Sequence, residues 1–280
     1  MEVGFRSFLL RIHRRLGRVL QGGGVGEAKP LSELEMLLTF YMGQKQTLDI
    51  VQVGANDGLG GNPINRFVSK YPKRTRLLLC EPQPEIARLL VQNFGWHPDV
   101  SVFEGGIAVG GDSSSRAEPL LWRVIPDVWE RIESRYSRRN KIPSFRAASG
   151  FASSKKSHVI KHLSRYRWKT TGGKINVADA IEGLRIRWST IRELLDLYPD
   201  FAQVDVLVID VEGLDDKVIL SAMEAHVLPP IVFFEIKHLS DEDYLFVSRR
   251  LEEHGYVLVG LGSDAIAIKT LIEENPAFGL

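Results

Sequence analysis

Four carboxyl or imidazole side chains follow two apolar, strand-like runs in the last third of the chain. Asp210 and Glu212 come after one run, and Glu235 and His238 come after the other. If both runs are parallel strands, these side chains reach one edge of a sheet, where open α/β sheets bind their ligands. Unpaired carboxylates are costly to bury, so a functional use is favoured. Any of the four could accept a proton from a hydroxyl group, although His238 could equally cap the next helix.

A glycine-bounded turn follows an earlier apolar run, residues 50–53, in which Gln52 is the one polar residue. The turn consists of Gly54, Ala55, Asn56, Asp57 and Gly58. Glycine lacks a Cβ atom, so the chain can bend sharply there, and the amide groups of the turn could converge on an anion above the strand end. This pattern is typical of a nucleotide-type site, and the alternative is an ordinary strand-to-turn junction.

The next two apolar runs also end in residues that could contact a nucleotide. Glu81 and Pro82 follow the first of them, about 20 residues beyond the glycine turn. At this spacing a βαβ unit places a carboxylate that accepts hydrogen bonds from ribose hydroxyls. The run 100–103 is followed by two glycines and then by Ile107 and Ala108. A flat base could lie against this backbone, or the glycines could form a simple turn.

These side chains come together only if the strands that carry them lie side by side and run in parallel. Helical patterns separate the apolar runs, as expected for an α/β fold with a parallel sheet. We expect the main helices at residues 31–44, 64–70, 84–93, 214–225 and 244–254. The last two apolar runs, 256–259 and 265–268, predict a C-terminal β-hairpin.

The composition is that of an ordinary globular protein, with 25% charged residues and a formal net charge of +1 over 280 residues. The single cysteine, Cys80, lies in an apolar run and is expected to be a buried strand residue. The longest apolar runs fall short of the ~18 residues that suggest a membrane-spanning helix. No signal peptide is visible, since Arg11, His13 and Arg14 interrupt the apolar stretch near the N-terminus. We therefore expect a cytoplasmic protein.

Residues 1–30 are expected to lie apart from the main domain, which takes up 31–280. A basic amphipathic helix is predicted at 5–20, and a Gly-rich linker follows it. Such a helix could make peripheral contact with an anionic membrane, or it could pack on the domain or on a second subunit.

A basic insertion is predicted within the main domain, at about residues 112–176. The segment 134–178 has no Asp or Glu but twelve Lys and Arg, with aromatic residues between them. Basic groups neutralise phosphates or carboxylates, and aromatic faces stack on sugar rings or bases. We therefore expect an anionic, hydroxylated acceptor, either a small molecule or a glycan; the alternative is a solvated loop. The small residues in 150–154 suggest the hinge of a lid.

Six motifs occur in an order that resembles the FkbM family of S-adenosylmethionine-dependent methyltransferases. They are VGANDG, CEPQPE, the strand end GIAV at 106–109, WSTIRELL, VLVIDVEGLD and IVFFEIKH, within residues 48–269. The resemblance implies a class I methyltransferase fold, a Rossmann-like, seven-stranded and mostly parallel sheet whose C-terminal hairpin inserts one antiparallel strand. It also implies S-adenosylmethionine as the methyl donor and O-methylation, commonly of sugar hydroxyls in glycans or secondary metabolites.

Carried over to this sequence, the resemblance gives the candidate residues their roles. The turn 54–58 would surround the methionine moiety, Glu81 would hold the ribose, and Asp210 and Glu212 would line the methyl-transfer site. Many family members carry an acid where this chain has Gln52, so that contact would be lost. A magnesium ion on Asp210 and Glu212 is possible but is not predicted, because two carboxylates are too few ligands.

Two other functions are compatible with parts of the sequence. The basic insertion and the N-terminal arm would suit a nucleic-acid-binding protein or an RNA methyltransferase, whose affinity would fall steeply with salt. A nicotinamide-dependent dehydrogenase is disfavoured, because no G-x-G-x-x-G motif follows the first strand.

Overall fold

The structure is a computed structural model that describes residues 31–108, 120–133, 148–164, 167–168 and 176–269. The N-terminal helix and linker expected at 1–30 lie outside the described residues, as does much of the basic insertion. None of the described helices has the length and hydrophobicity that crossing a bilayer requires.

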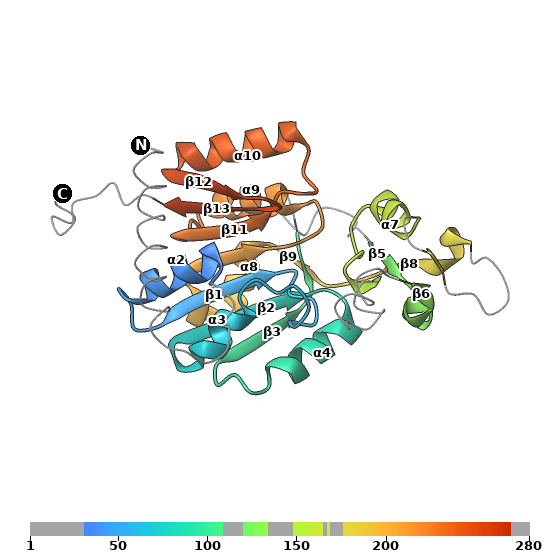
Figure 1. Cartoon of the computed structure of the whole chain (residues 1–280), viewed down its shortest axis with the longest axis horizontal. Coiled ribbons are helices and arrows are strands. Elements are labelled where there is room, and N and C mark those ends of the chain that lie inside the picture. The colour runs from blue at the N-terminus through green and yellow to red at the C-terminus, as the bar shows by residue number, and fades with distance from the viewer. Residues whose placement is uncertain (1–30, 109–119, 134–147, 165–166, 169–175, 270–280) are drawn as a thin grey trace, which may run out of the picture.

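Seven strands form one sheet in the order β12–β13–β11–β10–β1–β2–β3 (Figure 1). They are β1 (Leu48–Val53), β2 (Thr75–Glu81), β3 (Val100–Glu104), β10 (Val206–Ile209), β11 (Ile231–Glu235), β12 (Tyr256–Leu261) and β13 (Asp264–Lys269). The strands from β3 to β11 pair in parallel, whereas β13 is antiparallel to both β11 and β12. The sheet confirms the predicted fold, including the inserted antiparallel strand.

Both faces of the sheet are buried under helices, which is why its central strands are apolar on both sides. Alternate residues such as Ile50 and Leu77 pack on one face against three helices, α2 (Glu33–Met42), α3 (Asn65–Lys70) and α4 (Pro84–Phe94). Their neighbours, such as Val51 and Leu78, pack on the other face. The helices there are α8 (Ile191–Leu197), α9 (Asp215–Glu224) and α10 (Asp241–Glu253).

Side-chain caps set two helix starts that differ from the predicted ones. Ser32 Oγ accepts a hydrogen bond from Glu35 N at 3.1 Å, and Glu35 Oε2 accepts one from Ser32 N at 2.7 Å. This capping box starts α2 at Glu33 rather than at residue 31. Ser240 Oγ accepts from Asp243 N, so α10 begins at Asp241 and not at residue 244.

The described part of the insertion folds as a small layer of its own at one end of the sheet (Figure 1). Its elements are β5 (Leu121–Val124), β6 (Ile132–Glu133), α7 (Lys156–Leu163) and β7 (Arg167–Trp168), and β8 (Ile181–Leu184), which follows the insertion, pairs with β5. Its own apolar cluster includes Phe151, Val159 and Leu163, and it packs on Ile86 of α4. Arg123 also ties it to the domain, because its guanidinium pairs with Glu85 of α4.

The strand order changes direction at β1, which lies between β2 and β10. The chain builds the sheet outward from β1 on one side and then on the other, so a crevice opens at the carboxyl ends of β1 and β10. A parallel pair of short strands, β4 (Gly106–Ile107) and β9 (Trp188–Ser189), borders the same region.

Candidate active site

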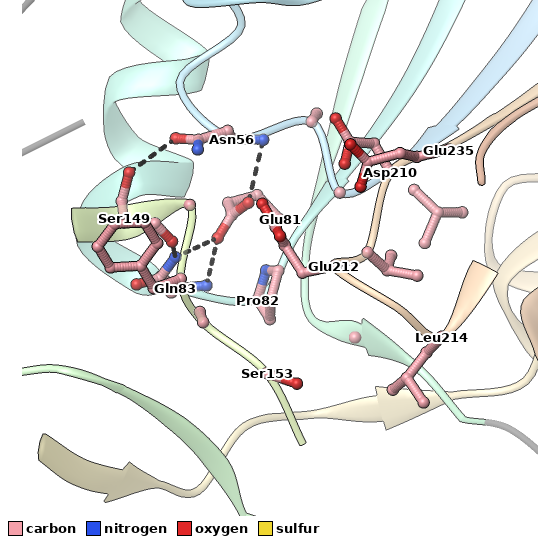
Figure 2. Close-up of a pocket in the computed structure, with 18 of the residues that line it drawn as sticks. Asn56, Glu81, Pro82, Gln83, Ser149, Ser153, Asp210, Glu212, Leu214 and Glu235 are labelled. Carbon is pink, nitrogen blue, oxygen red and sulfur yellow. Dashed lines mark hydrogen bonds between the residues drawn. The ribbon is translucent and has the colours of Figure 1, made fainter. Parts of the chain in front are cut away.

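A cavity of about 540 Å³ opens at the carboxyl ends of β1, β2, β10 and β11 (Figure 2). This volume is within the usual range for sites that bind small molecules and cofactors. The wall combines the glycine turn, Glu81 and the acidic residues after β10 and β11 with residues 149–154 of the insertion. The side chains that the sequence singled out therefore share one cavity.

The glycine turn lies against the loop that follows β10. Gly54 has φ +81°, and a Cβ atom there would lie 1.8 Å from the carbonyl oxygen of Asp210. Asn56 also has a positive φ, at 49°, a conformation that asparagine tolerates better than most residues. The absence of a side chain at Gly54 is thus what allows β1 and β10 to end side by side.

The amides of this turn do not converge on a ligand, contrary to the prediction. Gly54 N and Ala55 N both donate to Cys80 O at 3.0 Å, and Gly58 N donates to Ala55 O. The amides of residues 56 and 57 donate to the side chains of Glu81 and Asn56. All five amides of the turn therefore donate hydrogen bonds within the protein. The turn can line a ligand site, but its amides are not free to donate to the ligand.

Glu81 is 4% exposed and lies at the centre of a hydrogen-bond network (Figure 2). Its carboxylate accepts from Asn56 N at 3.1 Å, from Gln83 N at 2.9 Å and from Gln83 Nε2 at 3.2 Å. Burial raises the pKa of Glu81 to about 7, although these hydrogen bonds act in the opposite direction. Because a carboxylate has about four lone-pair positions, one remains for a hydroxyl of a ligand.

The insertion is part of this network. Gln83 Nε2 also donates to Ser149 O at 2.9 Å, and Ser149 Oγ donates to Asn56 Oδ1 at 3.1 Å. Phe151 and Ser153 are buried, and Ser153 exchanges two backbone hydrogen bonds with Trp122 of β5. The segment that was expected to be a lid hinge is thus a packed wall of the cavity.

The four candidate catalytic residues line the opposite wall. His238 Nε2 lies 3.4 Å from Glu212 Oε2 and 3.6 Å from Glu235 Oε2. Burial raises the pKa of Asp210 to about 6, and the nearby charges of Glu212 and Asp264 add to the effect. Burial also raises the pKa of Glu235 to about 7, with contributions from Asp210 and Glu212. The sequence correctly predicted that these side chains would meet.

Sequence reasoning missed a buried carboxyl beneath this wall. Asp215 is 0% exposed, and it accepts hydrogen bonds from Gly213 N and Glu235 N, both at 3.3 Å. Burial raises its pKa to about 8, with Asp210 and Glu235 contributing. Asp215 therefore joins the loops after β10 and β11, a link between distant segments that no local pattern reveals.

Two histidines of the insertion, His158 and His162 on α7, were also missed. His158 Nε2 lies 3.7 Å from Glu212 Oε2, and the rings of His158 and His162 stack at 4.3 Å between centroids. Their spacing of four residues places both on one face of a helix, and this was the available signal in the sequence.

Most of the predicted cofactor residues line the cavity, including residues 54–57, Glu81, Pro82 and Ile107. Two described residues that were predicted to bind the cofactor, Gly58 and Ala108, do not line the cavity. A Cβ atom at Gly58 would lie 2.2 Å from the Phe94 ring, so this glycine serves packing. Ala108 N donates to Ser189 O at 2.8 Å, which fixes the end of the β4–β9 pair.

The sequence model of the Methyltransferase FkbM domain matches residues 52–258. The chain belongs to the FkbM methyltransferase family. It is therefore an S-adenosylmethionine-dependent methyltransferase, and the match runs from within β1 to within β12, before β13 begins. A comparison with curated proteins finds no significant match.

Three solved methyltransferase structures are similar to this FkbM methyltransferase. A precorrin-6y C5,15-methyltransferase from Geobacter metallireducens has 12% identity and a TM-score of 0.39, over 88% of this chain and 94% of that one. A Podospora anserina methyltransferase bound to S-adenosylhomocysteine has 8% identity and a TM-score of 0.41, over 93% and 86%. A methyltransferase from Pyrococcus furiosus has 9% identity and a TM-score of 0.33, over 95% and 98%. The assignment to the family rests on the sequence match.

The affinity of this FkbM methyltransferase for S-adenosylmethionine is expected to fall as the pH drops below about 7. A carboxylate accepts ribose hydroxyls best when ionised, and Glu81, with a pKa of about 7, loses its charge in this range. Between about pH 7.5 and pH 6, the dissociation constant measured by calorimetry should rise on the order of tenfold. The Glu81→Gln variant should bind with a much flatter pH dependence; an equally steep one would show that another group titrates.

Proposed function

We propose that this FkbM methyltransferase transfers a methyl group to a hydroxyl oxygen of an anionic saccharide or a related hydroxylated metabolite. The proposal rests on the arrangement of the cavity walls. Glu81 and the glycine turn form one side, and Asp210 and Glu235 extend from neighbouring parallel strands on the other. A hydroxyl acceptor between these walls would meet carboxylate oxygens that can take up its proton.

The proposed cofactor fits the first wall. Glu81 would accept hydrogen bonds from the ribose, and the methionine moiety would lie along residues 54–57 of the glycine turn, which line the cavity. Gly105, Gly106 and the adjacent Trp188 line the part of the cavity where an adenine would lie. When bound, S-adenosylmethionine supplies an electrophilic methyl group on a sulfonium.

The protein must then align the acceptor oxygen and remove its proton. Asp210 and Glu235 are the proposed proton acceptors, because both line the cavity and follow adjacent strands, with Ile209 paired to Phe234. The Glu235 side chain is 16% exposed and lines the cavity, so an acceptor hydroxyl could approach its carboxylate.

Basic side chains near the cavity support an anionic acceptor. Lys237 lines the cavity and is largely exposed. Lys155, Lys156 and Lys161 are exposed on the described part of the insertion, and Lys156 Nζ lies 4.5 Å from the centroid of the Trp122 ring. A lysine held on an aromatic face keeps its positive charge at a fixed place on the surface, where it could pair with a negative group of an acceptor.

A labelled methyl donor tests the acceptor class directly. The protein should label hydroxyl-bearing acceptors from a panel of nucleotide sugars, acidic glycans, neutral glycans and RNA, and acidic saccharides should take up the most label. Identification of the labelled group as a methyl ether in the product would establish O-methylation. Label on RNA alone would replace this proposal with the RNA methyltransferase alternative.

Glu235→Gln and Asp210→Asn are each expected to lower kcat by about 10²-fold or more, because a positioned base contributes this much. Their dissociation constants for S-adenosylmethionine should stay within about threefold of the parent value, since neither carboxylate belongs to the Glu81 network. The control is Glu104→Gln, which removes an exposed carboxylate at the end of β3. An unchanged kcat in both variants would contradict the proposed proton acceptors.

A further inference from the structure

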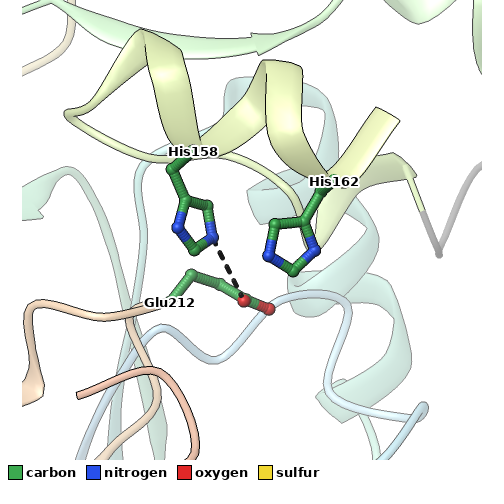
Figure 3. A group of neighbouring side chains, drawn as sticks. All are labelled: His158, His162 and Glu212. Atoms are coloured by element: carbon green, nitrogen blue, oxygen red, sulfur yellow. Dashed lines mark ion pairs between the residues drawn. The ribbon is translucent and has the colours of Figure 1, made fainter. Parts of the chain in front are cut away.

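A cluster of imidazole and carboxylate groups joins the insertion to the wall of the active-site cavity (Figure 3). His158 and His162 approach from α7, and Glu212 approaches from the loop after β10. The ligand atoms of these three residues all lie within 4.8 Å of one another. Glu212 also belongs to a second such group with Glu235 and His238. One carboxylate is therefore shared by nitrogen donors from two separate parts of the chain.

The distances in this cluster are long for hydrogen bonds and suitable for a shared ion. Glu212 Oε2 lies 3.4 Å from His238 Nε2 and 3.7 Å from His158 Nε2, beyond the usual 2.7–3.2 Å of an N–H···O bond. Two ligands bound tetrahedrally to one zinc ion at about 2.0–2.2 Å lie about 3.4 Å apart. Small side-chain adjustments would therefore bring these atoms onto one metal ion.

Ion pairing of protonated histidines explains the cluster less well. The rings of His158 and His162 stack at 4.3 Å and 25°, which would place two cations face to face if both were protonated. Among the described residues, none forms a hydrogen bond with the buried Nε2 atom of His158. Neutral imidazoles avoid this repulsion, and the neutral form is the one that binds metals.

The backbone around Glu212 also has the character of a functional site. Glu212 has φ +54°, a strained conformation that is uncommon for a residue other than glycine. Gly213 follows with φ +92°, and a Cβ atom there would lie 3.4 Å from the Cβ of His238. This conformation holds the Glu212 carboxylate between the two sets of histidines.

We propose that His158, His162, Glu212 and His238 bind one divalent transition-metal ion of the zinc type. Imidazole nitrogens suit zinc, cobalt, nickel and copper, whereas magnesium takes oxygen ligands. Such an ion would fasten α7 to the loops after β10 and β11 and would hold the insertion against the acceptor side of the cavity. The site differs from a magnesium ion on Asp210 and Glu212 both in its ligands and in its metal.

Metal binding by the full, tag-free chain tests this proposal after treatment with a chelator. Titration with Zn²⁺ in a calorimeter should give one site per chain. Titration with Co²⁺ should produce the visible absorption bands of a tetrahedral nitrogen- and oxygen-bound ion. The double variant H158A/H162A should bind Zn²⁺ at least about 100-fold more weakly, because half of the ligands are removed.

Two further variants keep the result interpretable. Glu212→Gln, outside the insertion, should also lose Zn²⁺, whereas His226→Asn, at an exposed histidine, should bind it like the parent. Retained S-adenosylmethionine binding shows that H158A/H162A is folded. If this variant does not fold, the Zn²⁺ affinity of Glu212→Gln tests the site in its place. Failure of the parent protein to bind Zn²⁺, or equal binding by the ligand variants, would overturn the proposal. Zn²⁺ is titrated without an acceptor, so the outcome does not depend on the proposed O-methylation.

Discussion

A Gly54→Ala variant is expected to lose measurable binding of S-adenosylmethionine and to unfold at a lower temperature. The new Cβ atom would lie 1.8 Å from the carbonyl oxygen of Asp210, so the ends of β1 and β10 would have to separate. The φ of +81° adds a conformational cost, and together the effects should destabilise the protein by on the order of 3 kcal/mol. For a chain of this size, that corresponds to a fall in Tm of about 6–12 °C.

Gly262→Ala is the matched control. Gly262 has nearly the same φ, +79°, but a Cβ atom there would have no neighbour within 4 Å. Its cost should be about 1 kcal/mol from the backbone conformation alone, and S-adenosylmethionine binding should be unchanged. If Gly54→Ala bound the donor within threefold of the parent protein, the close approach of β1 and β10 would not shape the cofactor site.

A Glu81→Gln variant is expected to bind S-adenosylmethionine roughly tenfold to 100-fold more weakly. Hydrogen bonds to a charged acceptor contribute about 1.5–3 kcal/mol, and an amide cannot supply the charge. The amide would also turn one donor toward Asn56 N or Gln83, which now donate to the carboxylate. Isothermal titration calorimetry measures the change, and circular dichroism verifies the fold.

Glu104→Gln is the control for this substitution. Glu104 is the register partner of Glu81 on β3, but its side chain is exposed. Removal of this carboxylate should leave the donor affinity within about twofold of the parent value. Equal affinities for Glu81→Gln and the parent protein would rule out the ribose contact.

The fold and the meeting point of the candidate residues could be predicted from the sequence, because parallel strands leave a strong local pattern. Buried on both faces, β10 appears as a continuous apolar run and β1 as an apolar run that only Gln52 interrupts at 50–53, and their ends meet at one edge. The acidic residues after β10 and β11 therefore had to be neighbours. Helix starts were less certain, since α10 begins at Asp241, three residues before the predicted start.

What the sequence could not reveal depends on contacts between distant segments. The amides of the glycine turn were expected to bind a ligand, but the neighbouring strand supplies acceptors for three of them, through Cys80 O and the Glu81 carboxylate, and the other two donate within the turn. Likewise, the spacing of His158 and His162 was visible, whereas their proximity to Glu212 depends on how the insertion packs. Composition indicated that the insertion is basic but not that it forms a wall of the cavity.

The most direct test of the cofactor site is a crystal structure of the protein with S-adenosylhomocysteine. We expect a ribose hydroxyl within hydrogen-bond distance of the Glu81 carboxylate, with the homocysteine beside Gly54 and the sulfur facing Asp210 and Glu235. A nucleoside bound elsewhere, or a ribose turned away from Glu81, would contradict it.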